Sequence, residues 1–157
     1  MRRLILTVAG AFLLVAALLP AAAQAAGGSS TGIPFSYQGV KGVSVLPVTF
    51  TAGDCRQTGL NQTPNLAASL VQVEPPVNGR ATVRWKGTLY TVSSRSGDVW
   101  HARFVFRDAF GQDVLTVRFD FGQMWPGTIY HSNSVAQVDL SQAQWDSITF
   151  SDWFGDC

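Results

Sequence analysis

The segment VWHARFVFRDAFGQDVLTVRFDF, residues 99–121, decides the fold class of this 157-residue chain. Two runs alternate between apolar and polar side chains on either side of the four residues 109–112. Alternation with a period of two is typical of a β-strand that buries one face. Four residues is also a common length for a hairpin loop. The segment therefore predicts an antiparallel hairpin of two amphipathic strands.

The alternation also predicts the register of this hairpin. With Asp108 facing Asp113, the apolar side chains face one another: Trp100 with Phe121, Ala102 with Phe119, Phe104 with Val117, and Phe106 with Leu115. A slip by one residue would set apolar residues against polar ones, so the pattern selects this pairing. On the opposite face, the same register sets Val105 against Thr116, His101 against Asp120, and Arg103 against Arg118.

Shorter segments of the same kind recur along the chain. They alternate or are rich in β-branched residues, with Gly, Pro, Asn and Asp between them: residues 35–40, 43–50, 70–73, 81–86, 89–93, 135–140 and 147–151. Long helices normally carry many lysines and glutamates, but the chain has only two Lys and one Glu. The sequence predicts an all-β fold, an antiparallel β-sandwich of Ig-like type, with a β-barrel or a jelly roll as alternatives.

Two short helical turns are expected at strand crossovers. In residues 63–70, Thr63 is placed to cap a helix and Pro64 occupies its first position. In residues 141–145, Ser141 and Gln144 have the spacing of a capping box. Neither segment is long enough for more than a turn or two.

The N-terminus has the organisation of an export signal. Arg2 and Arg3 precede an apolar run over residues 4–19, and the Ala-rich stretch that follows contains an A-x-A cleavage site. Because a membrane-spanning helix needs roughly 20 apolar residues, this run is too short for an anchor. We expect a secretory signal peptide over residues 1–25, a flexible leader over 26–32 and one β-sandwich domain over 33–157. The mature protein is expected to be extracellular or periplasmic, monomeric and without an integral membrane segment.

The chain has two cysteines, Cys55 and the terminal Cys157. In an oxidising compartment an even pair predicts one disulfide, and two cysteines allow a single intramolecular connectivity. Free thiols or an intermolecular bridge are the alternatives. A zinc site that also used His101 and His131 lacks the short ligand spacings of zinc sites, so no metal is predicted.

Charge and motifs exclude several functions. Without Arg2 and Arg3, nine basic residues face ten acidic ones, a net charge of −1 that favours neither nucleic acid nor an anionic membrane. The one G-x-S-x-G match, residues 28–32, lacks the strand and helix that a nucleophile elbow requires. No phosphate loop or metalloprotease motif occurs, so neither a cofactor nor catalytic residues are predicted.

The distribution of charge singles out one face of the hairpin. Residues 80–118 carry a net charge of +4, whereas residues 119–157 carry −5 and contain no Lys or Arg. Two arginines opposite each other destabilise a sheet unless an anion lies between them. One interpretation is that the acidic C-terminal segment, residues 139–156, packs beside this basic face and neutralises it. The other is that Arg103 and Arg118 bind an anionic group of a partner, with His101 positioned by Asp120 and with Arg84 or Arg107 nearby.

Tryptophan supplies a second candidate site. Trp85 and Trp100 share the parity of the surrounding apolar residues and are expected in the core, whereas Trp125 follows a strand end in a loop. An exposed loop tryptophan can anchor a protein or stack on a sugar. We expect a non-enzymatic module that binds an extracellular or cell-envelope protein, as an inhibitor or surface adaptor. A carbohydrate-binding module, with an anionic glycan as ligand, and a small secreted hydrolase are the alternatives.

Overall fold

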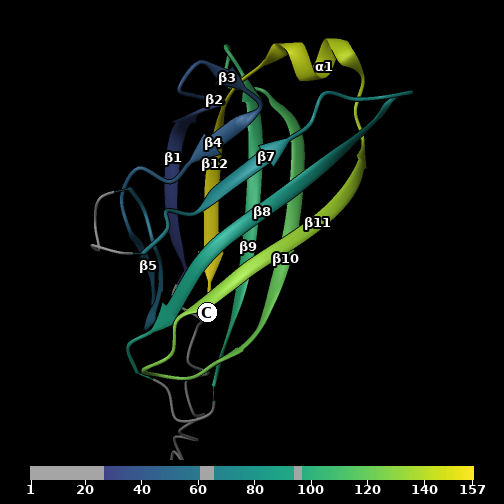
Figure 1. Cartoon of the computed structure of the whole chain (residues 1–157). Coiled ribbons are helices and arrows are strands. Elements are labelled where there is room, and N and C mark those ends of the chain that lie inside the picture. Colours follow the sequence, from purple (N-terminus) through teal and green to yellow (C-terminus); the bar gives the residue numbers. More distant parts are fainter. Residues whose placement is uncertain (1–26, 61–65, 94–96) are drawn as a thin grey trace, which may run out of the picture.

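The computed structural model describes residues 27–60, 66–93 and 97–157, and these form an all-β sandwich of antiparallel sheets (Figure 1). The four-stranded sheet has the order β1 (Gly28–Pro34), β12 (Ile148–Asp156), β9 (Asp98–Asp108) and β10 (Asp113–Met124). The six-stranded sheet has the order β4 (Val43–Val45), β7 (Leu70–Val73), β8 (Arg80–Thr91), β6 (Cys55–Gln57) and β5 (Phe50–Ala52), and β11 (Tyr130–Asp139) also pairs with β8. A small hairpin joins β2 (Ser36–Tyr37) and β3 (Val40–Lys41).

The predicted all-β sandwich is confirmed, and the barrel alternative is wrong, since neither sheet closes on itself within the described residues. The Ig-like type stays a prediction. The core lies between the two sheets and is dominated by aromatic rings, which bury large apolar areas. Trp85 and Trp100 are fully buried, as expected. Phe104 of β9 lies 5.8 Å from Trp85 and 5.0 Å from Trp153 between ring centroids, so one ring joins both sheets.

The predicted hairpin register holds between β9 and β10. All seven pairs from Trp100 with Phe121 to Phe106 with Leu115 are present. The expected pair of Asp108 and Asp113 is wrong, because a register shift places Asp113 opposite Arg107. The Oδ1 atom of Asp108 accepts hydrogen bonds from the backbone N–H groups of Phe110 and Gln112, both at 2.9 Å. Asp108 therefore closes the loop, as Asp residues do in turns, and does not face the other strand.

Strand β8 replaces two expected strands. Residues 81–86 and 89–93 were expected as separate segments, but Arg80–Thr91 is continuous through Gly87. A Cβ atom at position 87 would lie 2.7 Å from the indole of Trp85. The glycine thus leaves room for the buried ring and does not end the strand.

Strand β1 corrects the expectation of a flexible leader over residues 26–32. Its residues pair with β12, with Gly28 opposite Gly155 and Ser29 opposite Phe154. A Cβ atom at Gly28 would overlap the backbone carbonyl of Thr51 in β5. The glycines therefore allow neighbouring backbones to pack closely. Composition alone does not distinguish glycines in this role from glycines in a flexible segment. The expected signal peptide, residues 1–25, lies outside the described residues.

One of the two expected helical turns is present. Helix α1 (Gln142–Ser147) begins with the predicted capping box, in which the Ser141 hydroxyl and the Gln144 side chain each accept the other residue's backbone N–H. Residues 63–65 of the other expected turn lie outside the described residues, and residues 66–69 are not helical. No helix in the described ranges is long and apolar enough to cross a membrane.

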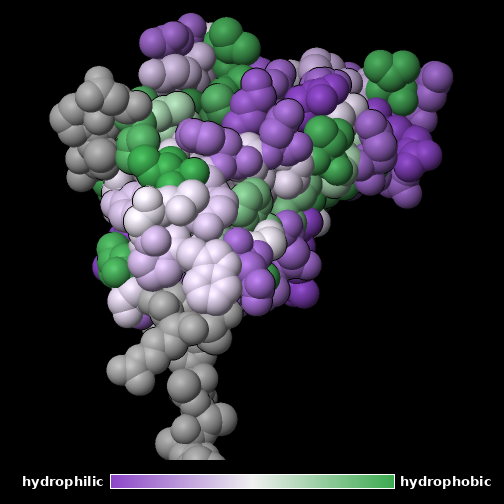
Figure 2. Space-filling view, turned by 60° about the horizontal axis from the view of Figure 1, so that its bottom comes forward, coloured by the Kyte–Doolittle hydropathy of each residue, from purple (hydrophilic) through white to green (hydrophobic). Residues whose placement is uncertain are grey.

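The outer face of the six-stranded sheet is largely hydrophilic. Figure 2, in which the bottom of Figure 1 is turned forward, shows purple side chains over the upper right of the molecule and separate hydrophobic groups among them. Val77 and Val135 are exposed, at 72% and 51% of their surface. Scattered single apolar residues of this kind are ordinary on a protein surface.

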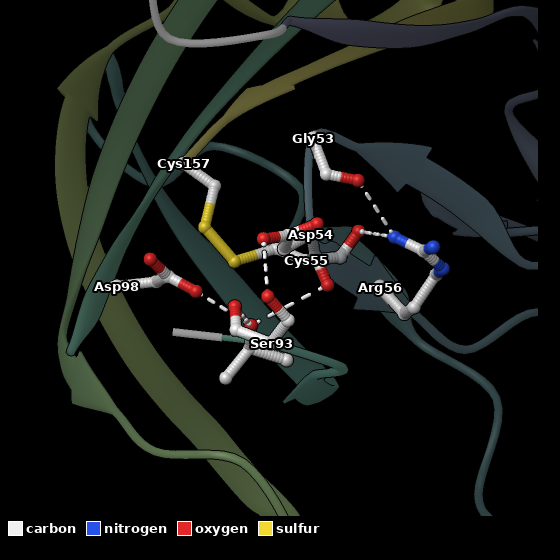
Figure 3. Close-up of a disulfide and its surroundings, with 8 residues drawn as sticks. Gly53, Asp54, Cys55, Arg56, Ser93, Asp98 and Cys157 are labelled. Carbon is white, nitrogen blue, oxygen red and sulfur yellow. Dashed lines mark hydrogen bonds between the residues drawn. A yellow bond between two sulfur atoms is a disulfide. The ribbon is translucent and has the colours of Figure 1, made fainter. Parts of the chain in front are cut away.

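The predicted disulfide joins the two sheets (Figure 3). Cys55 begins β6 in the six-stranded sheet, and Cys157 follows β12 in the four-stranded sheet, with 6.1 Å between their Cα atoms. Beside the bridge, Thr91 donates a hydrogen bond to Asp98 at 2.5 Å, and Ser93 donates one to Asp54 at 3.0 Å. The C-terminus is thereby held against the opposite sheet.

Candidate functional site

An open cleft of about 810 Å³ lies on the outer face of the four-stranded sheet. All four strands contribute to its lining, because successive outward-facing residues of β1, β12, β9 and β10 lie side by side across the sheet. The lining includes Arg103, Arg118, His101 and Asp120. The structure thus brings together four of the five residues that the sequence singles out.

The first cross-strand line of side chains, which we call the arginine row, consists of Ser29, Phe154, Arg103 and Arg118. The guanidinium of Arg103 lies 4.1 Å from the ring centroid of Phe154, a stacked cation–π contact. Arg118 lies directly opposite Arg103 on the neighbouring strand. Among the described residues, no ion pair or hydrogen bond engages either guanidinium. Both are exposed, so their charges are available to a ligand.

The second line, which we call the histidine row, consists of Asp156, His101 and Asp120. Nδ1 of His101 donates a hydrogen bond to Oδ1 of Asp120 at 2.7 Å. This contact orients the imidazole, and the two side chains remain 53% and 77% exposed. The carboxylate of Asp156 is exposed and has no partner among the described side chains.

Between the two rows the cleft floor is made of backbone and small residues. Gly28, Gly155 and Ala102 occupy adjacent strands there. A Cβ atom at Gly155 would lie 2.5 Å from the indole of Trp100 on the core side. Ala102 is buried and the two glycines have no side chain, so the outer surface of the floor between the rows is backbone.

The acidic C-terminal strand does pack beside the basic face, as one interpretation expected. Asp152 of β12 forms an ion pair with Arg107 at 2.8 Å, and Asp113 meets the same guanidinium at 2.9 Å. The charge of Arg103 is not neutralised in this way, because Arg103 faces Phe154 and not a carboxylate. Arg107 is therefore engaged within the protein and is no second anion ligand.

Arg84 was expected near the site as the alternative to Arg107, and it does not lie at the cleft. It belongs to β8, whose outer face is on the other side of the sandwich, and its Nε donates to Oε1 of Glu74 at 2.8 Å. That hydrogen bond holds the pKa of the Glu74 carboxyl below its ordinary value. Parity along β8 showed that Arg84 points outward but not which sheet the strand joins.

Trp125 lies apart from the cleft. It follows β10 directly, is 47% exposed, and its backbone N–H donates to the Tyr130 hydroxyl at 2.9 Å. A smaller hollow of about 330 Å³ near this end is lined by apolar side chains that include Leu66, Tyr90 and Ile129, without Trp125. The structure thus leaves Trp125 as an exposed loop residue outside both cavities.

The sequence did not point to Phe154 or Asp156. Both face the cleft because β12 pairs with β9, with Phe154 opposite Arg103 and Asp156 opposite His101. The only available signal was the acidic bias of the C-terminal segment. Pairing between strands about 50 residues apart leaves no local mark in the sequence.

The cleft holds one hydrogen-bonded histidine–aspartate pair, His101 and Asp120. The hydrogen bond from His101 to Asp120 is the arrangement that orients a general base. Within the described residues, however, no hydroxyl or other nucleophilic side chain forms a hydrogen bond with His101. Outside the cleft, within the described residues, a carboxylate oxygen of Asp98 and the sulfur atoms of Cys55 and Cys157 lie close enough together to be considered as metal ligands. Both sulfur atoms belong to the disulfide.

The fold and the site define an all-β sandwich with a charged cleft across one sheet. Comparisons with protein-family models, with curated proteins and with solved structures find no match. The function therefore has to be argued from the cleft itself.

Proposed function

We propose that this protein is an exported, non-enzymatic module that binds an anionic group of an extracellular or cell-envelope protein through Arg103 and Arg118. The observation that carries this proposal is the pairing of these two guanidinium groups, opposite each other in a cleft, without an acidic partner among the described residues. Like charges in this position destabilise the sheet. A bound carboxylate, sulfate or phosphate would remove that repulsion and accept hydrogen bonds from both groups.

Two neighbouring contacts support the role of these arginines. The ring of Phe154 holds the Arg103 guanidinium above the cleft, which lowers the conformational entropy that binding would cost. His101, oriented by Asp120, presents its other ring nitrogen toward solvent as a further polar group. Arg103 also covers the phenyl ring of Phe154, so this ring offers no free stacking platform for a sugar. The cleft therefore suits a protein partner better than a neutral glycan.

Export is part of the same proposal. The N-terminal segment has a basic start, an apolar run and small residues before Ala26, and the domain carries a disulfide. Protein recovered from the secreted or periplasmic fraction should begin near Ala26, as N-terminal sequencing would show. Recovery of the protein in the cytoplasmic fraction, as chains that still begin at Met1, would contradict export.

The binding proposal is tested by affinity capture with matched variants. Oxidised wild-type protein, the Arg103→Ala/Arg118→Ala variant and the Arg80→Ala/Arg84→Ala variant are immobilised and exposed to the organism's secreted and cell-envelope fractions. The two variants lose the same charge from opposite faces. Wild type and the Arg80/Arg84 control should retain one protein in stoichiometric amount, and the Arg103/Arg118 variant should lose it.

The affinity for the captured protein should fall tenfold or more in the Arg103/Arg118 variant, because charge-assisted hydrogen bonds contribute about 1.5–3 kcal/mol each. The salt dependence of Kd should flatten in the same variant. Equal capture by both variants would reject the arginine pair as the site. Capture of a glycan alone would support the carbohydrate-binding alternative instead.

A further inference from the structure

We infer that the cleft recognises a pair of opposite charges: an extended segment of the partner protein that carries an acidic and a basic side chain two residues apart. This inference rests on the proposed function and adds the second half of the site. The arginine row provides the anion-binding half, and the histidine row provides an acidic half beside it.

The histidine row has carboxylates on both sides of His101. Asp120 uses one oxygen for the imidazole, and its side chain is 77% exposed, so the other oxygen is open to the cleft. Asp156 is exposed and engages no partner within the described residues. The two carboxylates of this row attract an ammonium or guanidinium group beside the anion held by the arginine row. A ligand that carries both charges therefore forms favourable interactions with both rows.

The separation of the rows sets the spacing in the ligand. Arg103 and His101 are two residues apart on β9, and Arg118 and Asp120 are two apart on β10. At about 3.3–3.4 Å per residue, the rows lie roughly 7 Å apart. The α-ammonium and α-carboxylate groups of a free amino acid are much closer together than this and do not reach both rows.

An extended peptide has the matching period. Its side chains at positions i and i+2 point to the same side and are also roughly 7 Å apart. In a helix, residues i and i+2 point in different directions, so two charges at this spacing do not both face the cleft. The floor at Gly28, Gly155 and Ala102 has no outward side chain and leaves room for the backbone of a segment that lies along β9. The occupant is therefore an extended acid-x-base or base-x-acid segment.

The inference is tested with short synthetic peptides in nuclear magnetic resonance titrations of the oxidised protein. The probes are acetyl-Thr-Glu-Val-Lys-Thr-amide, its reverse acetyl-Thr-Lys-Val-Glu-Thr-amide, and two controls. The first control, acetyl-Thr-Glu-Lys-Val-Thr-amide, has the same composition with adjacent charges. The second, acetyl-Thr-Glu-Val-Gln-Thr-amide, lacks the base.

One of the two spaced peptides should bind wild-type protein at least fivefold more tightly than both controls, with shifts at β9, β10 and β12. The Asp120→Asn/Asp156→Asn variant should lose this preference, since asparagine keeps the hydrogen bond to His101 but removes the charges. The matched variant Asp139→Asn/Asp146→Asn removes two charges outside the cleft and should keep the preference.

The outcomes separate this inference from the proposed function. If the acid-only peptide binds as tightly as the spaced peptides, and only Arg103→Ala/Arg118→Ala weakens both, the charge pair is rejected and anion binding stands. If the Asp120/Asp156 variant binds every peptide equally more tightly, the acidic row is only repulsive, and the inference is again wrong. If no peptide binds in an arginine-dependent manner, the charge-pair inference is overturned together with anion binding of this kind.

Discussion

The two outer faces of the sandwich are built from the same alternating pattern, but they differ in how their arginines are neutralised. On the six-stranded sheet, Arg84 meets Glu74 at 2.8 Å and Arg80 meets Asp139 at 3.7 Å. On the four-stranded sheet, Arg103 faces Arg118 across the strands. The first arrangement is what surface charges usually adopt. The second is unfavourable by itself, and for this reason we assign a binding role to it.

The largest expected effect concerns the bridge that joins the two sheets. Cys55→Ser with Cys157→Ser should lower the free energy of unfolding by about 2–5 kcal/mol, because the unfolded chain loses a long-range cross-link. Urea unfolding of the oxidised wild type and the variant measures this difference. Reduced wild-type protein is the control and should behave like the variant. A difference below about 1 kcal/mol would mean that the sheets hold together without the bridge.

The next prediction compares two arginines of the four-stranded sheet, Arg107, which forms ion pairs, and Arg118, which forms none among the described residues. Arg107→Ala removes the cation beside Asp152, whose side chain is only 11% exposed. A buried acceptor without its partner costs about 1–3 kcal/mol, so the free energy of unfolding should fall by that amount. Arg107→Ala combined with Asp152→Asn should recover part of the loss. If Arg107→Ala unfolds at the same urea concentration as Arg118→Ala, the distinction between engaged and free arginines fails.

Removal of one arginine charge should change the free energy of unfolding by a smaller amount, and in opposite directions on the two faces. Arg118→Gln removes a repulsion and should raise the free energy of unfolding by about 0.2–1 kcal/mol in low-salt buffer without sulfate or phosphate. Arg84→Gln removes an ion pair and should lower the stability slightly. Parallel unfolding curves test the signs. A loss of stability in both variants would give Arg118 a structural role and weaken the case for a site.

The smallest expected effect is the pH dependence of the pair on the six-stranded sheet. The hydrogen bond from Arg84 lowers the pKa of Glu74 in the folded protein, so its stabilisation is present above the ordinary glutamate pKa and is lost as the pH falls through the lowered value. Glu74→Gln should therefore be slightly less stable than wild type at pH 7, and this difference should shrink at a pH well below the ordinary glutamate pKa. An equal difference at both pH values would contradict a titrating contact.

The alternation of apolar and polar residues and the helix-capping residues predicted those parts of the fold whose contacts lie close together in the sequence. The alternation around residues 99–121 gave the register of β9 and β10, and Ser141 with Gln144 gave the cap of α1. The predicted pairing of Asp108 with Asp113 was wrong. The hydrogen bonds by which Asp108 closes its own turn outweigh cross-strand pairing at the end of the hairpin. Residues 28–32, which form part of β1, were misassigned to a flexible leader, because glycine is permissive in both loops and close-packed strands.

The site was predicted only in part for the same reason. Arg103, Arg118, His101 and Asp120 lie on one hairpin, and its alternation placed them on one face. Phe154, Asp156 and Ser29 complete the cleft from β12 and β1, which are distant in sequence. Several strands share a similar pattern, so the identity of each strand's neighbour depends on the packing of the whole core.

The central claim is that Arg103 and Arg118 form an unneutralised pair that binds an anion. Its most direct test follows the side-chain Nε–Hε resonances of ¹⁵N-labelled arginines during titration with sodium sulfate at constant ionic strength, with single Arg→Lys variants for assignment. The resonances of Arg103 and Arg118 should shift together and saturate, while those of Arg80, Arg84 and Arg107 stay in place. Equal, unsaturated shifts of all these arginines, or no shift at Arg103 and Arg118, would contradict the claim.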